Sequence, residues 1–154
     1  MFKIGLIKAP TFYISAFFER NRAEYYERLL TISSGYEWTG WIEFFLKAVI
    51  EQAHNNQMKA AEILELYENK KNQVVKITHS QYSIHALDYI ISHPVFKSSD
   101  FTAIEEIPTP AAKRILAVFR DKGLLRTVRE ASGRRPAIYA FSELINTTEG
   151  QKIF

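Results

Sequence analysis

The chain has 154 residues, a formal net charge of +3 and no cysteine. The absence of cysteine excludes disulfides, thiolate metal ligands and a cysteine nucleophile. Charges interrupt every apolar stretch well before membrane-spanning length, and the N-terminus has no apolar run long enough for a signal peptide. We therefore expect a soluble cytoplasmic protein with one ordinary domain or two small ones.

Three helices are predicted in the N-terminal half. The first runs from about Pro10 or Thr11 to Leu30, the second from about Trp38 to Ala53, and the third from about Gln57 to Val75. In the second helix, apolar residues recur at three- and four-residue spacing, which predicts one face packed on a core. That face consists of Trp38, Trp41, Ile42, Phe45, Val49 and Ala53.

A polar junction at residues 78–81 marks the expected domain boundary. We accordingly divide the chain into a helical segment, residues 1–78, and a second domain, residues 79–154. The second domain is expected to begin with a helix from Ser83 to Ser92. His93-Pro94 ends that helix, because the residue before a proline is disfavoured in the helical conformation.

The next part of the second domain has the pattern of a helix-turn-helix. A short capped segment, residues 99–106, precedes a helix expected from Thr109 to about Lys122. Thr109 is predicted to cap this helix with its hydroxyl, Pro110 suits the first helical position, and Gly123 ends the helix. One apolar stripe is expected to face a core, namely Ala112, Ile115, Leu116 and Phe119.

A β-hairpin is predicted after this helix, from strand-like runs at residues 124–130 and 137–141 around a turn at residues 131–136. The order of helix, helix and hairpin is that of a winged helix-turn-helix. Between residues 108 and 141, eight basic residues against two acidic ones leave +6, so the rest of the chain is net −3. Positive charge concentrated on one module is the footprint of a protein that binds a phosphate backbone.

Double-stranded DNA is therefore one expected partner of the second domain. On the expected helix from Thr109, the side opposite the apolar stripe carries Lys113 and Arg120, around the small Ala117. The candidate DNA-binding residues are Thr109, Lys113, Arg114, Arg120, Arg126, Arg129, Arg134 and Arg135. The alternative is a winged helix used for protein docking, whose charges only keep it solvated, and the sequence leaves both open.

No catalytic site is expected. The four histidines lie at positions 54, 79, 85 and 93, without the spacing or the carboxylate partners of a metal site. The six glycines are scattered singly, so no phosphate-binding glycine loop is present. We assign no catalytic residue, metal or cofactor to this chain.

Two segments lie outside the winged module, Asn21-Arg22-Ala23-Glu24-Tyr25-Tyr26-Glu27-Arg28-Leu29-Leu30 and Glu37-Trp38-Thr39-Gly40-Trp41-Ile42-Glu43-Phe44-Phe45-Leu46. Both resemble the helices that follow the active-site motif in Fic-family proteins. Residues 5–15 are similar to the family's Gly-Leu-Leu, Pro, Leu-Tyr-Leu-Ser passage, and many longer Fic proteins append a winged helix. The resemblance implies a mainly α fold with a small β-hairpin, in which a helical Fic-like segment is followed by a winged helix-turn-helix domain.

The Fic resemblance also implies what this chain lacks. Fic proteins transfer AMP with a His-Pro-Phe motif and a Gly-Asn-Gly-Arg loop, and neither occurs here. We expect the C-terminal part of such a protein: a non-catalytic DNA-binding regulator, or else a module that positions targets in an AMP-transfer system. Because the catalytic half on which these helices would pack is missing, we expect some of their apolar residues to be exposed. Such residues would contact a second copy of the chain in a homodimer, or a Fic catalytic core. The candidate interface residues are Phe12, Phe17, Tyr25 and Trp38.

Overall fold

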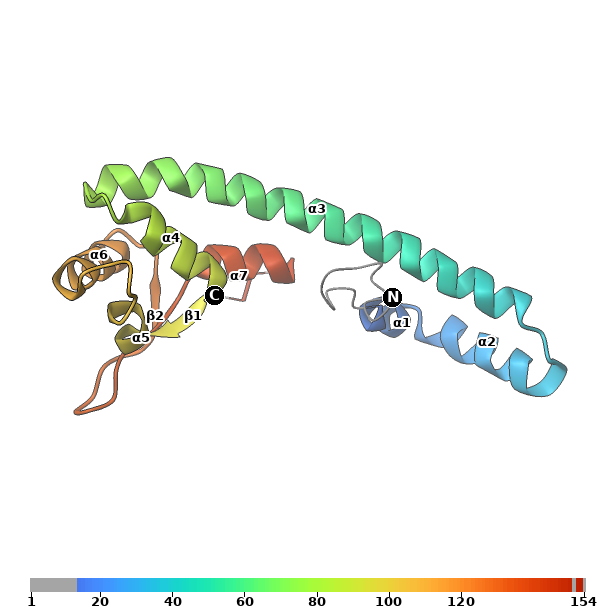
Figure 1. The fold of residues 1–154 in the computed structure, drawn as a ribbon. Helices are drawn as coiled ribbons and strands as arrows, with labels where there is room; N and C mark the ends of the chain where they lie inside the picture. The colour runs from blue at the N-terminus through green and yellow to red at the C-terminus, as the bar shows by residue number, and fades with distance from the viewer. Residues whose placement is uncertain (1–13, 151, 154) are drawn as a thin grey trace. The chain divides into compact units, whose positions relative to one another are not determined.

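The computed structural model describes residues 14–150, 152 and 153 and is mainly helical, with a small antiparallel sheet (Figure 1). The chain divides into two compact units, residues 1–60 and 61–154. This division falls within one long helix, α3 (Thr39–Thr78), rather than at the polar junction that follows it. The later part of α3 groups with the second unit because Leu66 and Val74 belong to its core. No described helix has both the length and the apolar content needed to span a membrane.

The first unit contains α1 (Ser15–Arg20), α2 (Arg22–Gly35) and the first part of α3. The single helix expected up to Leu30 is therefore wrong, because the backbone leaves the helical region at Asn21, whose side-chain amide donates to the carbonyl of Phe17. Helix α2 continues through the predicted break at residues 31–35. The hydroxyls of Thr31, Ser33 and Ser34 bond to carbonyls three or four residues earlier, so the helix accommodates these polar side chains.

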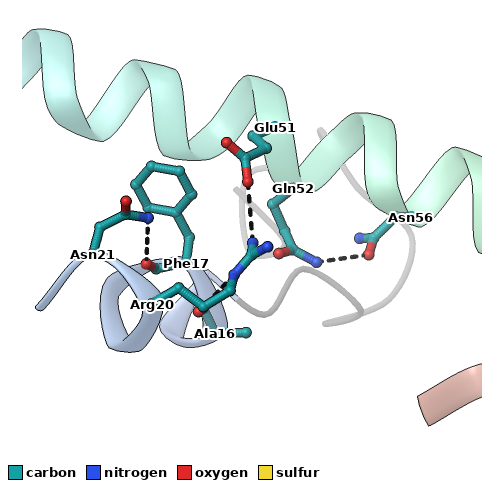
Figure 2. A network of polar contacts seen from close by, with 7 residues as sticks. All are labelled: Ala16, Phe17, Arg20, Asn21, Glu51, Gln52 and Asn56. Atoms are coloured by element: carbon teal, nitrogen blue, oxygen red, sulfur yellow. Dashed lines mark hydrogen bonds and ion pairs between the residues drawn. The ribbon is translucent and has the colours of Figure 1, made fainter. Parts of the chain in front are cut away.

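The core of the first unit is small and aromatic. Phe17, Phe44 and Ala48 are buried, and the Phe17 and Phe44 ring centroids lie 5.5 Å apart. An ion pair between Arg20 and Glu51, with an N–O distance of 3.1 Å, links α1 to α3 (Figure 2).

Helix α3 runs through residues 54–56, where the sequence analysis expected a break between two helices. The side-chain amide of Gln52 donates to Asn56 Oδ1 at 2.9 Å, one helical turn ahead, and this contact supports the helix across the polar stretch (Figure 2). The helix ends at His79, whose φ of 48° places it in the left-handed region. The hydroxyl of Thr78 then bonds to that of Ser83 and fixes the turn into α4.

The second unit places four further helices around a three-stranded sheet. The helices are α4 (Ser83–Ser92), α5 (Ser98–Thr102), α6 (Thr109–Asp121) and α7 (Ser142–Glu149). The strands are β1 (Val95–Lys97), β2 (Arg126–Arg129) and β3 (Ile138–Ala140), and their order in the sheet is β1-β3-β2.

The predicted hairpin is confirmed as β2 and β3, whereas β1 was missed because it forms by pairing with a strand far along the chain. Phe96 of β1 pairs with Tyr139 of β3, and both side chains lie in the core. The predicted stripe of α6 is confirmed as buried: Ala112, Ile115, Leu116 and Phe119 all belong to this core. Lys70 of α3 lies largely buried and pairs with Glu143 of α7 at 2.5 Å.

Candidate nucleic-acid interface

Helix α6 presents two candidate cations to solvent. Lys113 and Arg114 are exposed, and neither makes an ion pair or a side-chain hydrogen bond with any residue that the structure describes. The opposite side of α6 is fixed in the core through Ile115 and Phe119. The helix therefore holds both positive charges on a rigid element, where they are available to an external anion.

Arg120, one turn further along α6, already has a partner. Its Nε and Nη2 donate to Asp121 Oδ1 at 2.9 and 2.8 Å. The hydrogen bond and the charge of Asp121 raise the pKa of the Arg120 guanidinium, and the Tyr139 hydroxyl adds to the effect. Both charged side chains are at least half exposed, so this ion pair can exchange with another anion.

Thr109 does not have its predicted role. The structure places the N-cap at Pro108 and shows no side-chain cap, so the prediction of a Thr109 hydroxyl cap is wrong. Proline supplies no side-chain acceptor, and the Thr109 hydroxyl instead donates to the carbonyl of Thr102 at 3.5 Å. Thr109 remains exposed at the start of the helix.

The other candidate cations lie on the hairpin. Arg126 and Arg129 are exposed on β2, and Arg129 Nη2 donates to the carbonyl of Pro136 at 3.4 Å, across the hairpin. The register of β2 against β3 shifts between Thr127 and Arg129. Such a bulge bends a strand and increases its local twist.

The end of the hairpin is a tight turn that carries two arginines. Ser132 and Arg135 exchange backbone hydrogen bonds of 3.1 and 2.9 Å, with Gly133 and Arg134 between them. Gly133 has a φ of 56°, which a glycine first in a two-residue turn adopts without strain. The loop extends away from the helices of this unit (Figure 1), and Arg134 and Arg135 have no side-chain partner among the described residues.

A pocket of about 300 Å³ lies between α5, α6 and β3. Lys113 and Arg120 line it from α6, and Ser98, Ser99 and Thr102 line it from α5. Tyr139 contributes from β3, and Leu116, Ala117 and Pro136 add apolar surface. We call it the α5–α6 pocket. Sequence reasoning found its two cations but missed the hydroxyl side, because α5 was expected only as a short capped segment.

The candidate interface residues of the first unit have different environments. Phe12 lies outside the described residues. Phe17 is buried in the aromatic core, so the expectation that it is exposed is wrong. Tyr25 is partly buried against Trp41, with ring centroids 5.7 Å apart. Trp38 is 55% exposed and is the one described candidate that a partner can reach freely.

Sequence reasoning missed a wider apolar surface on α3. Ile42, Phe45, Leu46 and Ile50 are all exposed, up to 71% for Ile50, and they recur at three- and four-residue spacing. We call these four residues the open α3 face. The helix was expected to pack two of them, Ile42 and Phe45, on a core, but it uses Phe44 and Ala48 instead.

Within residues 14–150, 152 and 153, no cluster of three histidine or carboxylate side chains is placed to hold a metal ion. A scan against protein-family models finds no match for this chain.

Proposed function

We propose that the second unit is a winged helix-turn-helix that binds double-stranded DNA and acts as a non-catalytic regulator. The observation that carries this proposal is a set of four exposed cations that have no side-chain partner among the described residues. Lys113 and Arg114 lie on α6, and Arg134 and Arg135 lie at the end of the hairpin.

The order of elements supports the winged-helix assignment. Helix α4, strand β1, the helix pair α5 and α6, and then the β2–β3 hairpin follow one another along the chain, and β3 lies centrally in the sheet. In such a module, the second helix of the pair enters the major groove and the hairpin contacts the flanking backbone. Helix α6 suits that role because its cations and its buried stripe occupy opposite sides.

A gel shift with mixed-sequence duplexes at low salt tests DNA binding. We expect binding by the unmodified protein and weaker binding after Arg134→Ala with Arg135→Ala, because arginines at a hairpin end contact phosphates. The matched control is Lys47→Ala with Lys76→Ala, which removes the same charge from exposed positions of α3. No shift at low salt, or equal losses in the two double variants, contradicts the proposal.

The second candidate function is a protein-interaction module of a Fic-type AMP-transfer system. The open α3 face favours it, because a row of exposed large apolar side chains on one helix marks a surface for a partner. The packing of Tyr25 against Trp41 also joins the two segments that carry the Fic resemblance into one cluster. We propose a second copy of the chain as the occupant of this face in the isolated protein, with the Fic catalytic core as the competing occupant.

Two leucine substitutions on α3 test this surface. Leu46 is 53% exposed on the open α3 face, and Leu64 is 62% exposed elsewhere on the same helix. Light scattering should show a dimer at low micromolar concentration, which Leu46→Glu dissociates and Leu64→Glu does not. A stable monomer refutes the dimer. Capture of a Fic catalytic core that Leu46→Glu abolishes then supports the alternative.

A further inference from the structure

We propose that the α5–α6 pocket holds one phosphate of the DNA backbone and that Asp121 competes with this phosphate for Arg120. The inference deepens the proposed DNA binding and rests on it. In this proposal, the Ser98 hydroxyl donates to the phosphate, and Asp121, an acidic residue within the basic module, regulates binding.

The donors of the pocket match a phosphate. Lys113 offers an ammonium group with no partner among the described residues. Ser99 and Thr102 already donate their hydroxyl protons, to Asp100 and to backbone carbonyls of α5 respectively. The Ser98 hydroxyl has no such partner in the described part of the chain and is free to donate. Serine hydroxyls, lysine and arginine are the usual donors to backbone phosphates.

The size and lining of the pocket favour a phosphate within a chain over a free ion. The pocket has a volume of about 300 Å³ and is open to solvent, which leaves room for a phosphate and an adjoining sugar. The apolar side chains of Leu116, Ala117 and Pro136 lie in the same lining, where sugar carbons can contact them. A free phosphate ion would leave this apolar part unused.

Arg120 links the pocket to Asp121. Arg120 lines the pocket, whereas Asp121 is not among the lining residues. The carboxylate takes the Nε donor and one Nη2 donor and offsets the positive charge of the guanidinium. An incoming phosphate therefore binds the remaining N–H groups beside a like charge, or it replaces the carboxylate. Because both side chains are exposed, the exchange requires no change in the fold. Asp121 therefore lowers the affinity of the pocket through Arg120 specifically.

A double-mutant cycle with Asp121→Asn and Arg120→Ala separates this role from general charge. Binding to a short duplex is measured by fluorescence anisotropy at low salt. We expect Asp121→Asn to tighten binding by about two- to fivefold, the range of an exposed charge contact, and to act no more strongly than Glu130→Gln when Arg120 is alanine. The matched control, Glu130→Gln, removes a negative charge from the exposed hairpin and should act equally in both backgrounds. An equal gain from Asp121→Asn in both backgrounds overturns the competition.

Failure of the duplex to bind would refute the proposed DNA binding. A second measurement tests the pocket independently of that result. Amide shifts of Ser98 and Ala117 are followed by NMR during titration with a dinucleotide and, separately, with inorganic phosphate. We expect saturable shifts with the dinucleotide that Lys113→Ala weakens. An absence of shifts with both ligands overturns the phosphate site, and tighter binding of inorganic phosphate overturns its assignment to a nucleic-acid backbone.

Discussion

Replacing Arg134 and Arg135 by alanine should halve the salt dependence of DNA binding. Four candidate cations have no side-chain partner among the described residues, and each that neutralises a phosphate contributes about −0.9 to the slope of log K against log salt. The expected slope is therefore about −3.6 per protomer, or about 150-fold in affinity between about 50 and 200 mM salt. The double variant retains two such cations, so its slope should be about −1.8. Its affinity should then fall by about 12-fold between about 50 and 200 mM salt.

Fluorescence anisotropy at several salt concentrations measures these slopes. The Lys47→Ala and Lys76→Ala variant serves again as the control, because it has the same net charge as the hairpin variant and should keep the full slope. A hairpin variant whose slope lies within about half a unit of the unmodified protein refutes the contact, since two lost phosphate contacts must change the slope by more than that.

Three further predictions concern the two units. Ser83→Ala should cost about 1–3 kcal/mol in urea unfolding followed by circular dichroism, because the buried Ser83 hydroxyl bonds to the Thr78 hydroxyl and to the carbonyl of Ser80. Phe119→Ala should cost about 3–5 kcal/mol in the same assay. The backbone N–H of Gly40 donates to the Glu37 carboxylate and lowers its pKa. The contact therefore stabilises the first unit fully at pH values above 4.5, the ordinary pKa, and this stabilisation is lost as the pH falls through the lowered pKa. Tryptophan fluorescence should show an acid transition that Glu37→Gln weakens.

The elements of the second unit were predicted best where a local signal was strong. Helix α6 has a four-residue apolar stripe, and Gly123 follows it with a φ of 73°. Helix α4 ends at Ser92, just before His93-Pro94, as expected. Strand β1 carries no comparable signal, because its position depends on pairing with β3 more than forty residues later. Local periodicity cannot report such a distant contact.

Helix α3 shows a different limit. Its N-terminal part has two apolar faces, one through Phe44 and Ala48 and the other through Ile42 and Leu46. Helical periodicity identifies both faces, but it does not tell which of them a neighbouring helix covers. The predicted core face included Ile42 and Phe45, and the structure leaves both exposed. This exposed row of apolar side chains therefore marks a candidate interface.

Charge counting has a related limit in the candidate site. The sequence assigns Lys113 and Arg120 equally to one positive surface, yet only Arg120 has a carboxylate partner in the structure. Asp121 follows Arg120 directly, and neighbouring helical residues do not usually face each other. The long arginine side chain nevertheless reaches the carboxylate, because both lie at the exposed end of α6. In a charge count, Asp121 only reduces the net charge by one. In the proposed site, it competes with a phosphate for Arg120, and the double-mutant cycle measures this competition.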